Sequence, residues 1–186
     1  MANLETSLAK NGLKLIRQLS KGWTSYVYLA EGRGGKKFAI KALREKSNRR
    51  DMARRESENL ALANSAGIGP KLVKADLEKD IVMMEYVKGA LFSEWLESGP
   101  SKGELENFID ELFSQAARLD KIGLDHGQLA GRGRNILVRE GMPVIIDFEK
   151  ASTKRKVHNL KVVESFLFRS KDSEMVKKIG EILGKT

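Results

Sequence analysis

The sequence predicts an α+β protein with two lobes, a strand-rich first half and a mainly helical second half. The first half alternates apolar and polar residues over short stretches, which is the period of half-buried strands. The second half spaces its apolar residues three and four apart, as helices with one buried face do. A chain of 186 residues suits one compact domain or two small lobes. We expect a single domain over 1–186, with lobes over 1–88 and 89–186.

The first lobe is expected to contain five strands and one helix. Short links between the first three strands make them antiparallel neighbours, and two more strands follow the helix. Ser47 or Asn48 can cap the start of this helix, Gly67 can cap its end, and Pro70 prevents its continuation. Gly89 marks the boundary of the lobe. The expected strands cover 12–20, 24–32, 36–43, 71–76 and 80–87, and the helix covers 47–67.

The second lobe is expected to contain helices and one small hairpin. A short helix over 90–98 precedes a longer helix that begins with the capping-box spacing of Ser101 and Glu104. The longer helix ends near Gly123, and its apolar residues fall on one face, so its aromatic side chains belong to a core. The remaining elements are a hairpin over 135–148, turning at Glu140-Gly141, and two helices near 156–168 and 172–183.

The composition excludes several classes of protein. The chain has no cysteine, which removes disulfides, thiolate metal sites and thiol catalysis. Its two histidines are too few for a histidine-rich metal centre. No signal pattern opens the sequence, and no apolar run approaches the about 20 residues of a membrane span. We therefore expect a cytoplasmic protein with no membrane partner.

The chain carries a formal net charge of +9, concentrated in segments 44–55 and 150–156. Basic clusters attract phosphate-bearing partners such as nucleotides, RNA or a ribonucleoprotein. The alternative is a solvated surface of the kind found in heat-adapted proteins. No aromatic residues are interleaved with these charges, which favours the solvated surface over RNA binding.

Three features of the first lobe suggest a nucleotide site, and each has a plainer alternative. The turn around Gly22 in SKGWTSYV can place backbone N–H groups over phosphates, or it is an ordinary hairpin turn. Lys41 ends a strand, where a buried lysine needs a partner such as Glu56, or it extends to solvent. The stretch over 83–89 joins the lobes and offers backbone groups to adenine, or it is an edge strand.

Two oxygen donors flank the hairpin of the second lobe. Asn135 precedes one apolar run and Asp147 follows the other, so both are held rigidly. Mg²⁺ prefers oxygen ligands and takes one or two protein carboxylates together with substrate phosphates. The alternative for Asp147 is a strand-end turn or a helix cap.

The order of these motifs resembles the protein-kinase-like fold over roughly residues 12–150, with a five-stranded antiparallel first lobe and a reduced helical second lobe. The motifs are SKGWTSYV, FAIK, RRE in the helix, MEYV, HG…NILV and IIDFE. The compact second lobe is similar to small atypical archaeal kinases of the RIO and Bud32 kind. The pattern LDHGQL…VIIDFE resembles archaeal RIO-like predicted serine/threonine kinases.

The resemblance implies ATP and Mg²⁺ as ligands and gives roles to individual residues. Lys41 would contact the α- and β-phosphates and pair with Glu56, under a turn that includes Gly22. Asn135 and Asp147 would hold Mg²⁺. Adenine would lie beside the gatekeeper Met84, the carbonyl of Glu85 and the amide of Val87, between Val27, Ala39 and Leu137.

Three departures from the kinase pattern bear on activity. Two of the three loop glycines are missing, and Glu149 replaces the glycine of the D-F-G motif. The pattern H-x-D-x-x-x-x-N places an aspartate two residues after His126, where this chain has Gln128. Gln128 lies seven residues before Asn135 instead of five, and counting back five gives Ala130. No register restores an acid.

Three assignments for the missing base stay open. Asp125 can swing into the base position, Gln128 can orient a hydroxyl or a water, or the site binds nucleotide without turnover. The inserted AGRGR brings glycines, Arg132 and Arg134, which can face a phosphate or only charge the surface. His126 is expected to bond the loop backbone rather than carry a proton.

Three functions compete. The first, which we expect, is an ATP- and Mg²⁺-dependent serine/threonine protein kinase acting on a protein substrate or on itself. The second is a nucleotide-binding switch or slow ATPase, a pseudokinase, acting on an RNA–protein assembly. The third is a small-molecule phosphotransferase, because HG without an intervening arginine resembles antibiotic and sugar kinases. The short stretch after Glu149 leaves no room for a long activation segment or an extended peptide groove.

Overall fold

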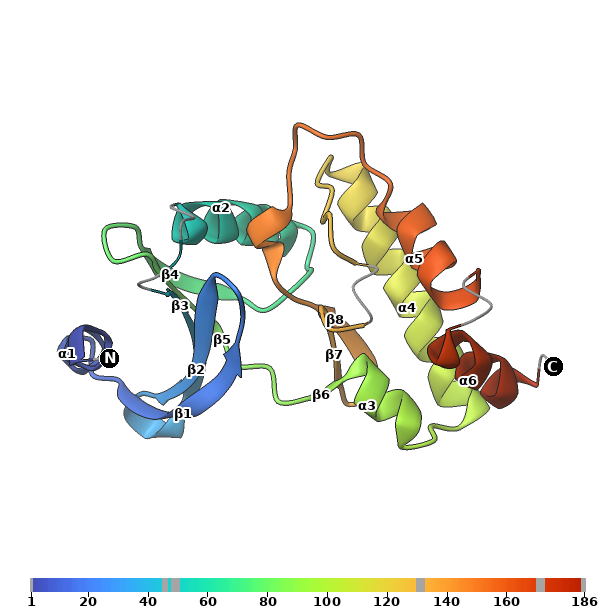
Figure 1. Cartoon of the computed structure of the whole chain (residues 1–186), viewed down its shortest axis with the longest axis horizontal. Coiled ribbons are helices and arrows are strands. Elements are labelled where there is room, and N and C mark those ends of the chain that lie inside the picture. The colour runs from blue at the N-terminus through green and yellow to red at the C-terminus, as the bar shows by residue number, and fades with distance from the viewer. Residues whose placement is uncertain (1, 45–46, 48–50, 130–132, 170–172, 185–186) are drawn as a thin grey trace.

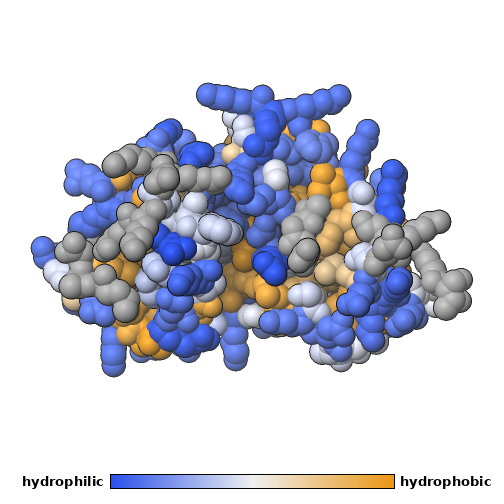
Figure 2. All heavy atoms as spheres, in the orientation of Figure 1, coloured by the Kyte–Doolittle hydropathy of each residue, from blue (hydrophilic) through white to orange (hydrophobic). Residues whose placement is uncertain are grey.

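The computed structural model describes residues 2–44, 47, 51–129, 133–169 and 173–184. The chain forms two lobes, one built on a sheet and the other mainly helical (Figure 1). Hydrophilic side chains cover most of the face seen in Figure 2, and apolar ones show in its middle, where the lobes meet. No helix within the described ranges is long and apolar enough to cross a membrane. The kinase-like α+β fold expected from the sequence is present.

The sheet of the first lobe is antiparallel throughout, with five strands in the order β1-β2-β3-β5-β4. Short links keep the first three strands adjacent, whereas a helix separates them from the last two. β5 therefore returns to pair beside β3. All five strands were expected, and they span β1 (Lys14–Lys21), β2 (Ser25–Glu31), β3 (Lys37–Leu43), β4 (Leu72–Asp76) and β5 (Ile81–Glu85).

Alternation along the strands gives this sheet two buried faces. Tyr28 and Ile40 point to one face and pack with Leu8 of α1 (Ala2–Lys10), a helix that the sequence did not predict. Ala39 points to the other face and packs with α2 (Met52–Ser65) and the second lobe. Lys41, two residues further along β3, shares this second face. Over the residues described in the first lobe there are thus two α-helices instead of the one expected.

The helix α2 begins later than the sequence indicated, at Met52. Ser47 lies before the helix, and Asn48, the other expected cap, lies outside the described residues. A distant residue satisfies the helix start instead, because the Ala53 amide donates to Asp80 Oδ1 at 2.6 Å. Asp80 belongs to the turn between β4 and β5. The expected end is confirmed, since Gly67 follows the helix with φ +71°.

The second lobe matches the expected order of helices and hairpin. The capping box of α4 is present, with the Ser101 amide 2.8 Å from Glu104 Oε2. Phe92 stacks on Phe108 in its core, with ring centroids 4.7 Å apart. The elements are β6 (Ala90–Leu91), α3 (Phe92–Glu97), α4 (Lys102–Lys121), β7 (Ile136–Arg139), β8 (Met142–Ile145), η2 (Phe148–Lys150), α5 (Asn159–Phe168) and α6 (Glu174–Leu183).

The link between the lobes is held close to the hairpin of the second lobe. β6, which the sequence did not predict, pairs with β7, and β7 pairs with β8. A Cβ atom at Gly89 would clash with the Val138 carbonyl, so only glycine fits where the link meets β7. The lobe boundary expected at Gly89 therefore coincides with a close backbone approach.

Candidate functional site

Lys41 lies at the junction of the lobes and contacts carboxylates from both. Its Nζ is 2.6 Å from Glu56 Oε2 and 2.6 Å from Asp147 Oδ1. Glu149 Oε2 is 3.5 Å away, and the lysine itself is only 6% exposed. The ion pair expected between Lys41 and Glu56 is therefore present, and Asp147 and Glu149 join it.

Local structure explains how these groups meet. Lys41 pairs in register with Val27 on β2, which directs its side chain to the face that α2 covers. Glu56 is fully enclosed, and its second oxygen accepts a hydrogen bond from the Phe148 amide at 3.1 Å. Asp147 ends the hairpin with φ +66°, a left-handed conformation that turns the chain sharply into η2. Glu56 consequently ties β3, α2 and η2 together.

Three carboxylates surround one ammonium group here, so negative charge is in excess. Burial alone would lower the pKa of Lys41, but Glu56 and Asp147 together raise it above its ordinary value. Burial opposes ionisation of Asp147, yet the Lys41 ammonium holds the pKa of that carboxyl below its ordinary value. Burial raises the pKa of Glu56 despite its contact with Lys41. Carboxylate oxygens are ligands that Mg²⁺ prefers, but here they surround Lys41, and the described residues contain no group of three or more acidic or histidine side chains placed to hold a metal ion.

The turn between β1 and β2 lies against this cluster. Thr24 Oγ1 donates to Glu149 Oε2 at 3.1 Å, which joins the turn to the motif after β8. The Gly22 amide donates to the Ser25 carbonyl at 2.9 Å, so this amide closes the hairpin turn. Within the described part of the chain, the amides of Trp23 and Thr24 make no hydrogen bond. Both amides can therefore donate hydrogen bonds to a bound anion.

The residues expected around adenine lie on both sheets. Met84, on β5, is buried and pairs in register with Ala39 on β3. The neighbouring strand β2 carries Val27. Val87 is also buried, and its amide makes no hydrogen bond with the residues that the structure describes. The side chain of Glu85 pairs with Arg139 at 2.6 Å, which fixes the start of the link to the second lobe. Leu137 lies on β7, opposite Leu91 and Val144.

His126 is a structural residue of the loop after α4. Its Nε2 is 3.0 Å from the Ile146 carbonyl, and its Nδ1 is 3.3 Å from the Gln128 amide. The ring is fully buried and packs edge-on against the Phe148 ring, with ring centroids 4.9 Å apart. Burial lowers the pKa of His126 to about 4, so the ring is neutral at physiological pH. The expectation that His126 bonds the loop backbone is confirmed.

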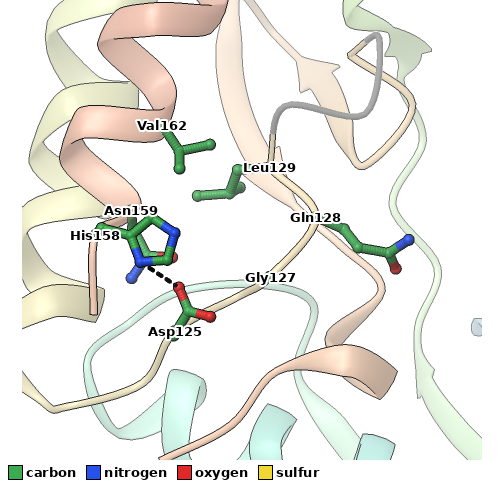
Figure 3. Close-up of a pocket in the computed structure, with 7 residues that line it drawn as sticks. All are labelled: Asp125, Gly127, Gln128, Leu129, His158, Asn159 and Val162. Carbon is green, nitrogen blue, oxygen red and sulfur yellow. Dashed lines mark ion pairs between the residues drawn. The ribbon is translucent and has the colours of Figure 1, made fainter. Parts of the chain in front are cut away.

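Asp125 and Gln128 lie on different sides of this loop. The Asp125 carboxylate is 2.7 Å from Arg155 Nε and 3.5 Å from His158 Nδ1, and the residue is 2% exposed. It lines a cavity of about 360 Å³ beside α5. Figure 3 shows that Gln128 points away from the other labelled residues of this cavity. The carboxylate is thus held in place by its own partners, which argues against its swinging toward the position of Gln128.

Asn135 is positioned by the same loop. Its side-chain nitrogen donates to the Gln128 carbonyl at 3.0 Å, and its own carbonyl accepts from the Ile146 amide at 2.9 Å. Its side-chain oxygen accepts no hydrogen bond from the described residues, so it can serve as a ligand. Arg134 is exposed. Of the inserted segment, Ala130, Gly131 and Arg132 lie outside the described residues.

Two residues of the site were not identified from the sequence. Glu149 was noted as a departure from D-F-G, and its substitution for a glycine was the signal that could have identified it. Arg155, the partner of Asp125, lies 30 residues further along the chain. No local pattern indicated that contact, because it depends on how the loop after η2 packs against the loop after α4.

Known proteins similar to this chain place it in a family. A family model described as RIO domain matches residues 33–169. The KEOPS complex subunit Bud32 of Pyrococcus abyssi is 32% identical over 101 residues, 54% of this chain and 44% of that protein. A probable bifunctional tRNA threonylcarbamoyladenosine biosynthesis protein of Methanoculleus marisnigri is 30% identical over 163 residues, 83% of this chain and 28% of that protein. The chain thus spans less than half the length of each relative. By its fold and this match over most of its length, the chain belongs to the RIO domain family.

Proposed function

We propose that this chain binds ATP with Mg²⁺ between its lobes and hydrolyses it slowly, as a kinase-like ATPase within an assembly that acts on tRNA. The observation that carries the proposal is the contrast between Lys41 and Asp125. Lys41 is held by Glu56, as a phosphate-binding lysine must be, whereas the carboxylate beside the loop is bound to Arg155. The name of one relative, a subunit of the KEOPS complex, supports an assembly, and the name of the other, a tRNA threonylcarbamoyladenosine biosynthesis protein, supports the tRNA setting.

The cluster contains the groups that would hold the nucleotide. Glu56 is anchored by the Phe148 amide, so it keeps Lys41 oriented toward the phosphates. Asp147 has a side chain 38% exposed, which makes it the carboxylate that can exchange Lys41 for a cation. Asn135 would supply the second oxygen. Mg²⁺, when bound, neutralises charge on the β- and γ-phosphates.

Gln128 would act on the nucleophile by orientation. An amide cannot accept a proton under ordinary conditions, but it can hold a water in line with the γ-phosphorus. The water oxygen then bonds to phosphorus and the bond to the ADP oxygen breaks. One proton of the water is released to solvent, and the other stays on the phosphate product. Because the transition state is loose, positioning and charge stabilisation carry most of the rate, and the loss of a base slows the reaction without stopping it.

Transfer to a serine or threonine hydroxyl is the second candidate, because the clamp around Lys41 serves either acceptor equally well. ATP labelled in the γ-phosphate separates the two. We expect the label in free phosphate, with little on the protein itself or on added protein, and no release by Asp147→Asn. Label that stays on protein would establish the kinase instead. Equal release by the wild type and Asp147→Asn would remove the cluster from the reaction.

A further inference from the structure

Trp23 is displayed to solvent at the tip of the turn between β1 and β2. It is 95% exposed, whereas the other exposed large apolar residues that the structure describes range from 38% to 56%. Leaving a large aromatic ring in water forgoes the stabilisation that burial would give. A ring in this position calls for a partner that covers it.

The backbone beneath this ring is held firmly. Arg44 Nη1 donates to the Gly22 carbonyl at 2.8 Å and to the Trp23 carbonyl at 3.3 Å. The Arg44 amide also donates to the Thr24 carbonyl at 2.8 Å. Together with the Gly22–Ser25 hydrogen bond, these contacts fix the turn from both sides. The backbone that carries the ring is thus fixed before a ligand binds, so the turn loses less conformational entropy on binding.

Two cations, Arg44 and Lys21, lie beside the turn. The Arg44 guanidinium lies 5.3 Å from the centre of the Tyr26 ring, and Lys21 is exposed at the position paired with Tyr26. In the sequence, the basic segment that begins at Arg44 contains no aromatic residue. The lack of aromatic residues among these charges argued against RNA binding in the sequence. In the folded chain, however, Arg44 lies beside Trp23 and Tyr26. Exposed rings among cations are the pattern by which proteins bind single-stranded nucleic acids.

We propose that Trp23, with Lys21 and Arg44, forms a stacking site for an unpaired base of an RNA strand, at the edge of the candidate nucleotide site. The inference deepens the proposed function and rests on it only for the choice of RNA over DNA. Positive charge favours a phosphate backbone, and a stacking ring requires a base face that a duplex hides. Thr24, next to Trp23, contacts Glu149 of the Lys41 cluster, so bound RNA would touch the turn that borders that cluster.

Fluorescence can test the site directly. The chain has two tryptophans, and Trp95 packs against Phe108 with ring centroids 5.0 Å apart. In Trp95→Phe the emission reports Trp23 alone, and a 12-nucleotide oligouridylate should quench it saturably. In parallel, anisotropy of the same oligonucleotide carrying a dye gives the dissociation constant for wild type and variants. Both titrations omit ATP, so a failure of the proposed ATPase would not affect them.

Loss of the ring should weaken binding strongly. Stacking on one aromatic residue is commonly worth a factor of about 5 to 150 in affinity, and Trp23→Ala should lose that factor while Trp23→Phe keeps much of it. Leu77→Ala is the matched control, because Leu77 is also an exposed apolar residue of the first lobe. Lys21→Ala should weaken binding a few-fold and reduce its salt dependence, whereas Lys102→Ala in the second lobe should not.

Three results would overturn the proposal. The first is unchanged oligouridylate binding by Trp23→Ala, with circular dichroism showing that the variant is folded. The second is equal affinity for a duplex RNA of the same length. The third is binding of an acidic peptide with the same dependence on Trp23, which would identify a protein partner instead. A dissociation constant that rises for Trp23→Ala, and not for Leu77→Ala, would establish the site.

Discussion

On one side of the candidate site Lys41 is clamped by Glu56 and Asp147, whereas on the other side the loop from His126 to Asn135 has lost its acid and gained two residues. The first side keeps every contact that a phosphate-binding lysine needs. In the second, Gln128 stands where the kinase pattern has aspartate. The difference teaches that nucleotide binding and proton transfer depend on separate parts of one site.

The carboxylate that directly precedes the altered loop in the sequence is part of its support. Asp125 pairs with Arg155, and its backbone exchanges hydrogen bonds with Ser152 at 3.0 and 2.8 Å. Asn159 adds to this support, because its side chain binds the His126 amide and the Leu124 carbonyl. The described start of the loop is therefore anchored beside α5, and the adjacent carboxylate, Asp125, is engaged by Arg155. Its architecture suits orientation of a nucleophile better than proton removal.

Removal of Lys41 should give the largest effect, because it disrupts the side of the site that matches the kinase pattern. Lys41→Met should lower ATP turnover by about 10²–10³-fold, through loss of charge stabilisation. It should also lower the free energy of unfolding by about 3 kcal/mol, since buried carboxylates lose their cation. A phosphate-release assay and urea denaturation measure the two effects. Lys37→Met, at the exposed first position of the same strand, should change neither; turnover retained by Lys41→Met would contradict the account.

Lowering the pH tests the altered loop. The pKa of His126 lies at about 4 in the folded chain, against 6.5 for the unfolded one. The unfolded state therefore binds the proton more tightly, and stability present above pH 6.5 is lost as the pH falls toward 4. The loss attributable to His126 should reach about 3 kcal/mol. Denaturation of His126→Gln should show a flatter dependence than the wild type over this range, while His158→Gln keeps it; an unchanged slope in His126→Gln would refute the buried neutral ring.

A pair of loop variants asks which residue serves the nucleophile. Gln128→Ala should lower turnover by about tenfold at unchanged ATP affinity, because the attacking water is no longer oriented while the contacts that bind the nucleotide remain. Asp125→Asn should leave turnover within about twofold, yet cost about 1–3 kcal/mol of unfolding free energy as the contact with Arg155 weakens. Steady-state kinetics and thermal melts measure both. A loss of turnover of about 10²-fold or more in Asp125→Asn would identify that residue as a base.

Arg134 should give the smallest effect. If its guanidinium faces a phosphate, Arg134→Ala should lower ATP turnover a few-fold with no measurable change in thermal stability, since the side chain is exposed. Arg169→Ala, which removes another exposed arginine of the second lobe, is the control. Equal turnover in wild type and Arg134→Ala would leave this arginine as surface charge.

The parts of the fold that the sequence predicted are those with local causes. The five strands follow from alternation along each segment, and α4 follows from its apolar stripe and the capping box at Ser101. The start of α2 was misplaced because Asp80, from a turn between two strands, satisfies the Ala53 amide. Helix α1 was missed because its amphipathic pattern is short, and its place depends on packing against the apolar cluster of β2 and β3 that includes Tyr28.

The same distinction applies to the candidate site. Lys41, Glu56 and Asp147 could be selected from the sequence because each stands at a fixed place in a strand, a helix or a hairpin. The partners that decide the chemistry of the loop could not, because Arg155 reaches Asp125 only through tertiary packing. The contact of Thr24 with Glu149 spans 125 residues and had no sequence signal beyond the missing glycine.

Isothermal titration calorimetry with Mg²⁺-ATP tests most directly whether the Lys41 side of the site grips a nucleotide on its own. We expect one nucleotide to bind per chain in the wild type, in Gln128→Ala and in Asp125→Asn with similar affinity, and binding to weaken at least about tenfold in Asp147→Asn. Absence of binding heat in the wild type at several temperatures, or equal affinity in Asp147→Asn, would contradict the account.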